Sequence, residues 1–233
     1  MTDKASSRAG ETGAVAVLFE DGDVLAVCKP EGLATIPERA GRADSLLFLL
    51  QAARGAKLFV VHRLDKEASG AILFAKNAAA HRFLNGQFER REVAKRYTAL
   101  AHGVVEEDRG VIDRPIRMYG SGRMGVDEAR GKPCVTAYEV TRRMRGYTLL
   151  ELRPTSGRRH QIRVHLYSVG HPIVGDRRYG DRLIQSSFPR LMLHASEIGF
   201  RLPSGGEMTV SSPPARTFGG VLESIESGET SGE

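Results

Sequence analysis

The sequence has few residues that could cross-link a protein and no segment that would anchor it in a membrane. Its two cysteines, Cys28 and Cys134, belong to no CxxC pair and to no His/Cys spacing typical of zinc ligands. We therefore expect no disulfide framework and no structural zinc. No apolar run approaches the ~18 residues that span a bilayer, and the polar start MTDKASSRAG lacks the apolar core of a signal peptide. A soluble, cytoplasmic protein without a membrane partner is expected.

Several motifs of cofactor and metal enzymes are also missing. The sequence has no P-loop, no GxGxxG after a strand, no GxSxG and no cysteine with a convincing histidine partner. His160 and His165 would diverge by about 140 degrees on a helix and could not share a metal. The acidic pair Asp21 and Asp23 is typical of a solvated turn, not of a two-metal site. We therefore expect neither a metal nor a cofactor.

Positive charge is in moderate excess. The chain has 27 arginines and 7 lysines against 28 acidic residues, which gives a net charge of +6 and a pI near 9.5. Such an excess attracts polyanions, and the planar guanidinium group suits phosphates and stacks on bases. Nucleic acid is a favoured partner, although an arginine-rich composition can also reflect a GC-rich genome.

Length and composition favour one continuous domain. At 233 residues and 41% apolar content, the chain can form one large domain or two small ones. Residues 1–12 and 218–233 are rich in small polar residues and glutamate, which bury too little surface to offset the entropy of ordering. We predict flexible ends there. No linker or repeat interrupts residues 13–217, which are predicted to form the catalytic domain.

Short β-like runs dominate the interior. The expected strands cover residues 14–20, 24–29, 57–63, 70–76, 95–103, 134–140, 147–153 and 191–200. They outnumber the helices and do not alternate with them as βαβ units. The sequence therefore predicts an α+β fold with a mixed, mostly antiparallel sheet and flanking helices.

Three helices are expected between these strands. One follows Asn77 as its N-cap, one covers SLLFLLQAA, and one runs from Thr155 or Ser156 to Gly170. On the last helix, the side chains expected to face a ligand groove are Arg159, Arg163 and Tyr167, with Ile162, Leu166 and Val169 facing inward.

Two polar segments are candidates for the chemistry. The first, KLFVVHRLDKEASGAILFAK at 57–76, displays Asp65 between two apolar strands, where polar groups tend to be functional. Taken alone, Asp65 is also consistent with an ordinary turn or capping residue. The second, at 155–180, concentrates five arginines and three histidines, and taken alone it could be an exposed basic helix.

Together these segments resemble the RluA family of RNA pseudouridine synthases. VHRLDKEASGAILFAK is similar to the family's signature loop, and five other blocks follow the family's order. These blocks are DGDVLAVCKPEGLATIP, AKRYTALAHG, GKPCVTAYEV, GRRHQIRVHLYSVGHPIVGDRRYG and LMLHASEIGF. The resemblance covers roughly residues 16–215. It implies the pseudouridine synthase fold with an RNA-binding cleft, and isomerisation of uridine without a cofactor.

The resemblance also implies roles for individual residues. Asp65 of HRLD would be the catalytic aspartate, Tyr97 of KRYTAL would pack against the target base, and Arg163 of HQIR would pair with the aspartate. Arg63 would help to open the RNA. The other residues expected to contact RNA are His62, Arg158, Arg159 and His160, with Arg177 and Arg178 as further candidates for phosphate contacts.

The chain departs from the family pattern at Ala68, where many members have a threonine whose hydroxyl could support the loop. The family's frequent S4 domain is not expected before the first block. The partner would be an rRNA or tRNA stem-loop rather than DNA, bound by a monomer. A noncatalytic RNA-binding protein on the same scaffold and a metal-dependent nuclease are the competing hypotheses.

Overall fold

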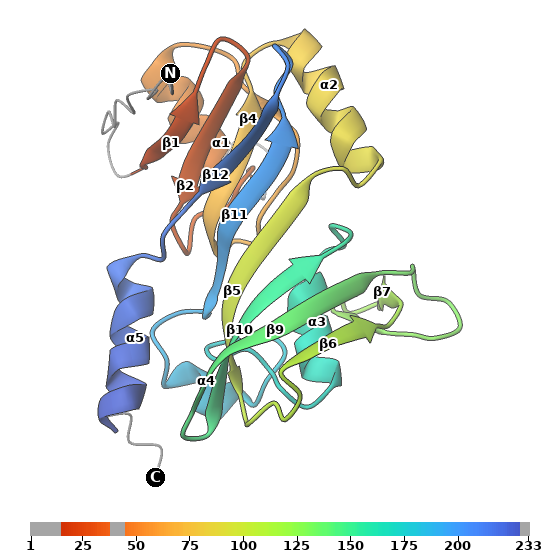
Figure 1. Cartoon of the computed structure of the whole chain (residues 1–233), viewed down its shortest axis with the longest axis vertical. Coiled ribbons are helices and arrows are strands. Elements are labelled where there is room, and N and C mark those ends of the chain that lie inside the picture. Colours follow the sequence, from red (N-terminus) through yellow and green to blue (C-terminus); the bar gives the residue numbers. More distant parts are fainter. Residues whose placement is uncertain (1–14, 38–44, 229–233) are drawn as a thin grey trace. The chain divides into compact units, whose positions relative to one another are not determined.

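The computed structural model describes residues 15–37 and 45–228, which fall into two units (Figure 1). The first unit consists of the described residues up to Val93 together with Glu197–Ser212. The second unit consists of Ala94–Ser196 and the described residues from Pro213 on. One continuous domain over 13–217 stays a prediction of the sequence. Residues 1–12, predicted to be flexible, lie outside the described residues.

The first unit is a sheet with two helices. Its elements are β1 (Val17–Glu20), β2 (Val24–Lys29), α1 (Leu46–Arg54), β3 (Phe59–Val60), β4 (Ser69–Ala75), α2 (Ala78–Glu89), the end of β11 (Leu193–Arg201) and β12 (Glu207–Ser211). The strand order is β1-β2-β4-β11, with β3 beside β4 and β12 beside β11. The pairings β1·β2, β2·β4, β3·β4 and β11·β12 are all antiparallel. All seven residues of β4 are buried, so this strand forms the middle of the unit's core.

Local signals in the sequence place the two helices of the first unit. Helix α2 begins after Asn77, as predicted, and the Asn77 side chain accepts a hydrogen bond from the Ala80 amide at 2.9 Å. Helix α1 is capped in the same way by Ser45. Ala80 and Leu84 of α2 are buried against Leu73 of β4 in one apolar cluster, because residues four apart share a helix face.

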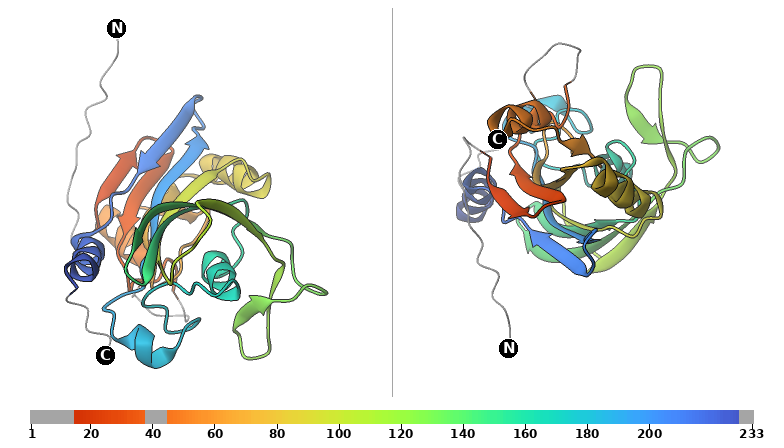
Figure 2. Two further views of the ribbon diagram at one scale, coloured as in Figure 1. Left: turned by 60° about the horizontal axis from the view of Figure 1, so that its bottom comes forward. Right: turned by 90° about the horizontal axis from the view of Figure 1, so that it is seen from above.

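The second unit holds another antiparallel group of strands. Its elements are β5 (Ala94–His102), β6 (Arg109–Asp113), β7 (Ile116–Met118), β8 (Met124–Val126), β9 (Val135–Met144), β10 (Tyr147–Pro154), α3 (Gln161–Ser168), α4 (Arg182–Ser186), the start of β11 and α5 (Arg216–Ser227). The order β5-β10-β9-β6 is antiparallel throughout. Strands β7 and β8 form a separate hairpin, which projects away from β9 and β10 in Figure 2. The predicted mixed, mostly antiparallel sheet with flanking helices is confirmed.

Helix α3 is shorter than predicted, because the residues after Ser156 form a turn. The Ser156 hydroxyl donates to Gln161 Oε1 at 2.7 Å, and the Arg158 amide donates to the same oxygen at 3.2 Å. His160 then takes a left-handed conformation with φ of 55°, so the helix starts only at Gln161. The predicted inward side is confirmed for Ile162 and Leu166, which are buried, but is wrong for Val169, which is 42% exposed. Arg163, predicted on another side, is also buried, with 3% exposure.

The predicted flexible tail from residue 218 differs from the structure. Residues 216–227 form α5, and Phe218, Val221 and Ile225 are its buried residues. These apolar residues recur every three or four positions, which is the spacing of one helix face. The prediction of a flexible end rested on the many Ser, Gly and Glu residues of this segment, and the apolar spacing was missed. No helix in the described part of the chain is both long and apolar enough to cross a membrane.

A buried histidine in the second unit predicts how stability depends on pH. His165 is fully buried, and burial lowers its pKa below the ordinary value. The unfolded chain therefore takes up a proton first as pH falls below about 6.5, so the free energy of unfolding should fall between pH 7 and pH 5. We expect His165→Gln to lose less stability than the wild type over this range in urea unfolding. Equal losses in both proteins would contradict the prediction.

Candidate active site

The loop that carries Asp65 is anchored to the rest of the first unit by a buried threonine. The predicted strand at 57–63 is paired only at Phe59–Val60, and the chain then leaves the sheet. The Thr35 hydroxyl donates to the Leu64 carbonyl at 3.0 Å and lies 3.2 Å from the Leu64 amide, which donates to it. Thr35 is 3% exposed and Leu64 is 4% exposed. The residue before Asp65 is therefore fixed, while Asp65 itself stays half-buried.

A buried lysine fixes the other side of the same loop. The Lys29 ammonium group donates to the carbonyl oxygens of Pro30 at 2.9 Å, Leu33 at 2.7 Å and Lys66 at 3.1 Å. Lys29 is fully buried, and a buried charge is tolerated only when its hydrogen bonds are satisfied. Its contact with Lys66, the residue after Asp65, ties the loop to the end of β2.

Removal of the Lys29 ammonium group should both destabilise the protein and loosen the loop. Lys29→Met keeps an unbranched side chain, one atom shorter, but leaves three carbonyl oxygens without this donor, and one unsatisfied buried group costs about 1–3 kcal/mol. We expect a loss of about 3 kcal/mol in urea unfolding, together with lower turnover. Lys132→Met, on an exposed residue, is the matched control. A Lys29 variant as stable as that control would contradict the assignment.

The other loop residues have different surroundings. His62 Nε2 accepts a hydrogen bond from the Leu73 amide at 3.0 Å, and the His62 ring stacks on Phe88 with centroids 4.7 Å apart. These contacts give His62 a packing role within the unit. Arg63 is exposed. Ala68 is 2% exposed, and its amide donates to the Asp65 carbonyl at 3.2 Å, so this turn closes without a threonine at that position.

In the second unit, Arg163 forms a buried two-point ion pair with Asp176. Arg163 Nε and Nη2 donate to Asp176 Oδ2 and Oδ1, both at 2.8 Å. The Arg163 side chain is 3% exposed and that of Asp176 is not exposed. Asp176 Oδ1 also accepts from the Arg178 and Tyr179 amides at 3.0 and 3.2 Å. The pair uses two of the five guanidinium N–H groups, so it orients Arg163 and leaves three N–H groups outside the pair.

Tyr179 extends this cluster toward the turn before α3. Its hydroxyl lies 2.7 Å from His160 Nδ1 and accepts from the Met124 amide at 3.2 Å. The Arg163 guanidinium lies 5.3 Å from the centroid of the Tyr179 ring, a distance typical of a cation–π contact. Burial raises the pKa of the Tyr179 phenol above its ordinary value, so the hydroxyl keeps its proton at neutral pH.

A glycine explains how Asp176 reaches its position. Gly175 has φ of 76°, and a Cβ atom there would overlap the carbonyl of Arg190. The Gly175 amide donates to Gln185 Oε1 at 2.6 Å. Only a residue without a side chain fits this close approach, so the packing requires glycine at the position before Asp176.

The remaining predicted site residues of the second unit are exposed or half-buried. Tyr97 is half-buried on β5, where it pairs with Leu152 of β10. Arg158 is half-buried in the turn before α3. Arg159 is exposed, and its Nη1 lies 3.8 Å from the sulfur of Met118. Arg177 and Arg178 are also exposed, and Arg178 Nη2 donates to the Gly122 carbonyl at 2.8 Å.

The predicted site residues are thus divided between the two units. His62, Arg63 and Asp65 belong to the first, whereas Tyr97, Arg158, Arg159, His160 and Arg163 belong to the second. Their assembly into one site stays a prediction of the family resemblance. Among the described residues, no group of three or more His, Cys, Asp or Glu side chains is arranged to hold a metal ion.

Sequence reasoning missed the residues that support the site. Lys29, Thr35, Asp176 and Tyr179 all fix a predicted site residue or its loop by hydrogen bonds. All four lie inside blocks that were quoted for the resemblance. The signal that could have identified these supporting residues was a polar residue inside a matching block, next to a Pro or Gly turn.

Comparisons with known proteins agree with the resemblance. The sequence profile of the RNA pseudouridylate synthase family matches residues 23–168. A dual-specificity RNA pseudouridine synthase RluA of Pasteurella multocida is 37% identical over 204 residues, which cover 85% of this chain and 93% of that protein. An uncharacterized RNA pseudouridine synthase of Bacillus subtilis, YlyB, is 38% identical over 200 residues, or 82% of this chain and 66% of that protein.

Solved structures give the same result for the fold. The structure of human RNA pseudouridylate synthase domain containing 1 has a TM-score of 0.75 and 30% identity, covering 88% of this chain and 86% of that one. Human RNA pseudouridylate synthase domain containing 4 also has a TM-score of 0.75, with 29% identity and coverage of 90% and 92%. The similarity therefore extends over both units of the chain.

Proposed function

Because the chain belongs to the RluA family of RNA pseudouridine synthases, we propose that it isomerises a specific uridine in ribosomal RNA, transfer RNA or both, with Asp65 as the catalytic carboxylate. The enzyme is an isomerase that acts on RNA. The observation that carries the proposal is Asp65 in its HRLD sequence, in a loop held on both sides by Thr35 and Lys29.

The reaction needs one well-placed carboxylate and no external reagent. The C1′–N1 glycosidic bond breaks, the freed uracil rotates, and a new bond forms between C1′ and C5 before the C5 proton leaves. Asp65 can act as the nucleophile at the sugar or base, or as the base that removes a sugar proton. The C5 proton is lost to solvent and N1 takes up a proton, so the product is an isomer of uridine and neither metal nor cofactor is part of the proposal.

Arg163 is proposed to orient Asp65. Its ion pair with Asp176 fixes the guanidinium plane, and a guanidinium group held in one plane is suited to carboxylate recognition. In this arrangement Asp176 is a positioning residue, because it acts through Arg163 and not on the substrate.

Tyr97 is proposed to pack against the extruded base. A base inside a stem must leave its stack first, at a cost of a few kcal/mol. Stacking on an aromatic ring can offset about 1–3 kcal/mol of that cost. Tyr97 is half-buried at the start of β5, so part of its ring surface is accessible.

The RNA backbone is proposed to lie along a set of basic side chains. These are Arg63 in the first unit and Arg158, Arg159 and His160 in the second. Phosphate contacts position an RNA without reading its sequence. The choice between rRNA and tRNA follows from recognition elements beyond these contacts. Among the relatives, Haemophilus ducreyi has one named ribosomal large subunit pseudouridine synthase D, which supports an rRNA target.

Tritium release from C5-labelled uridine tests the function. Bulk rRNA and tRNA transcripts are incubated separately with the wild-type protein, and released tritium is counted. We expect release from at least one of the two pools, followed by mapping of the modified position in that pool. No release from either pool, combined with measurable RNA binding, would favour the noncatalytic RNA-binding function instead.

A further inference from the structure

The second unit contains a cavity that the proposed reaction does not use. It has a volume of about 480 Å³ and lies between the β7–β8 hairpin and helix α3. This volume is within the range of pockets that bind small ligands. Met124, Val164 and Tyr179 are the buried residues of its lining, and Tyr119, Ser121, Arg123 and Tyr167 are the exposed ones. The cavity therefore has an apolar floor and a polar, aromatic rim.

The charge of the lining favours an anionic ligand. The described lining contains two arginines, Arg114 and Arg123, and no carboxylate. Glu128 approaches Arg114 Nε only at 3.9 Å, and both side chains are exposed, so this pair neutralises little charge. A second cavity in the same unit, of about 440 Å³, has the opposite character, because Glu106, Glu107 and Asp113 line it.

The aromatic residues of the rim favour a flat ligand. Tyr167 is 46% exposed and Tyr119 is 39% exposed, so both side chains present aromatic surface to the cavity mouth. The Arg123 guanidinium lies 5.5 Å from the Tyr167 ring centroid and 5.2 Å from that of Tyr179. Arginine and aromatic planes placed together are the side chains on which nucleic-acid bases stack.

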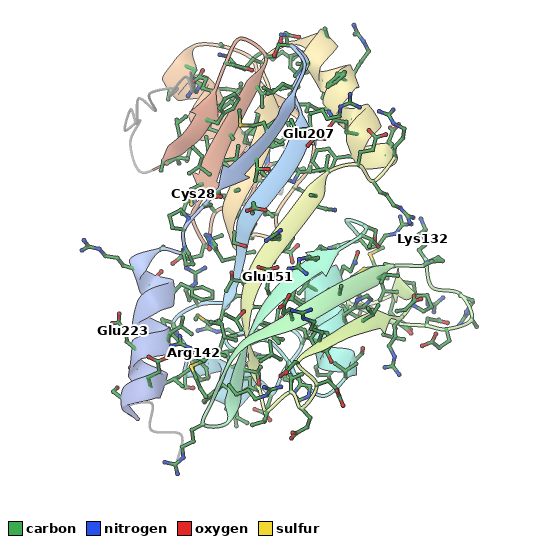
Figure 3. All side chains as sticks on the ribbon, in the orientation of Figure 1. Cys28, Lys132, Arg142, Glu151, Glu207 and Glu223 are labelled. Atoms are coloured by element: carbon green, nitrogen blue, oxygen red, sulfur yellow. The ribbon has the colours of Figure 1, made fainter. Side chains whose placement is uncertain are left out.

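The hairpin side of the cavity is preorganised. The Tyr119 hydroxyl donates to the Val126 carbonyl at 2.9 Å, and the Arg117 guanidinium lies 4.6 Å from the Tyr119 ring centroid. The loop after β8 is tied back to β7, since Lys132 pairs with Ile116; Lys132 is labelled in Figure 3. Fixing these side chains before binding lowers the entropy cost of holding a ligand.

We propose that this cavity binds one nucleotide of the substrate RNA other than the uridine that reacts. The base stacks on Tyr167 beside Arg123, and the adjoining phosphate lies against Arg114 and Arg123. That the ligand belongs to an RNA substrate rests on the proposed function. That it is a nucleotide is inferred from the lining, whose charged residues are both arginines, and from its exposed aromatic rings. A projecting hairpin that holds one nucleotide would extend the RNA contact beyond the reacting base (Figure 2).

Binding of a short fluorescein-labelled oligouridylate, followed by fluorescence anisotropy, tests the site directly. We expect Tyr167→Ala and Arg123→Ala each to weaken binding about tenfold. Tyr167→Phe, which keeps the ring, and Arg182→Ala, which removes a charge from the exposed start of α4, should stay within about twofold of the wild type. Wild-type affinity in both alanine variants would overturn the proposal.

Turnover separates this proposal from the proposed function. In tritium release from the modified RNA pool, the two alanine variants should show a raised KM with kcat unchanged, because the site holds the RNA and not the reacting base. A lower kcat with unchanged KM would overturn the nucleotide site. If the wild type releases no tritium, the proposed function fails, yet loss of oligouridylate binding in Tyr167→Ala but not in Tyr167→Phe would still support the site.

Discussion

Asp65→Asn is expected to abolish tritium release while RNA binding stays within about twofold of the wild type. Asparagine has the shape of aspartate but is neither a nucleophile nor a base. The loss should approach about 10⁴-fold, the upper range for a positioned acid–base group. Asp65 is half-buried, and the loop is fixed by the Lys29 and Thr35 contacts to its backbone, so the substitution should leave the fold intact.

The neighbouring residue Glu67 provides the matched control for Asp65. Glu67→Gln removes one carboxylate charge from the same loop, two residues further on. Turnover within about threefold of the wild type is expected for it, since removal of a surface charge changes electrostatics by a fraction of a kcal/mol. If Asp65→Asn turned over substrate as Glu67→Gln does, the carboxylate of Asp65 would not be the catalytic group.

Asp176→Leu is expected to cost about 3–5 kcal/mol in free energy of unfolding, because it leaves the buried Arg163 guanidinium without its counter-ion. Both side chains are almost wholly enclosed, so water cannot replace the lost interaction. Urea unfolding should show a lower midpoint with an unchanged m value. The Arg178 and Tyr179 amides would also lose their acceptor.

A double substitution separates the structural role of the pair from its role in turnover. Arg163→Met combined with Asp176→Leu replaces the ion pair by apolar side chains of similar size, a change that is often neutral or stabilising for buried pairs. We expect the double variant to recover most of the stability lost in Asp176→Leu but to show no tritium release. A double variant that is stable and active would show that Arg163 is not needed to orient Asp65.

Local patterns in the sequence were sufficient for the elements whose ends are set by neighbouring residues. The Asn77 cap predicted the start of helix α2, whose apolar residues Ala80 and Leu84, four positions apart, are buried. The alternation of YTLLELR predicted β10, where Leu150 and Leu152 are buried. In each case a hydrogen bond or a side-chain period within a few residues decides the conformation.

The same reasoning failed where a distant residue changes the local preference. Ser156 was predicted as a helix cap, but its hydroxyl and the Arg158 amide both bond the side chain of Gln161. Periodicity placed Arg163 on a side of the helix expected to face a ligand groove. The carboxylate of Asp176, thirteen residues away in sequence, instead makes a buried position for it. The helical period relates only residues of the helix itself, and Asp176 lies beyond the end of α3.

The sequence by itself determined the family and the strand-rich fold, and it predicts which residues do the chemistry. These depend on residue types in a fixed order along the chain, and that order is present in the sequence alone. Only the tertiary structure decided what supports those residues: Lys29 and Thr35 at the Asp65 loop, and Asp176 and Tyr179 at Arg163. A buried charge requires partners from other segments to offset its desolvation, and which segments meet is decided only when the chain folds.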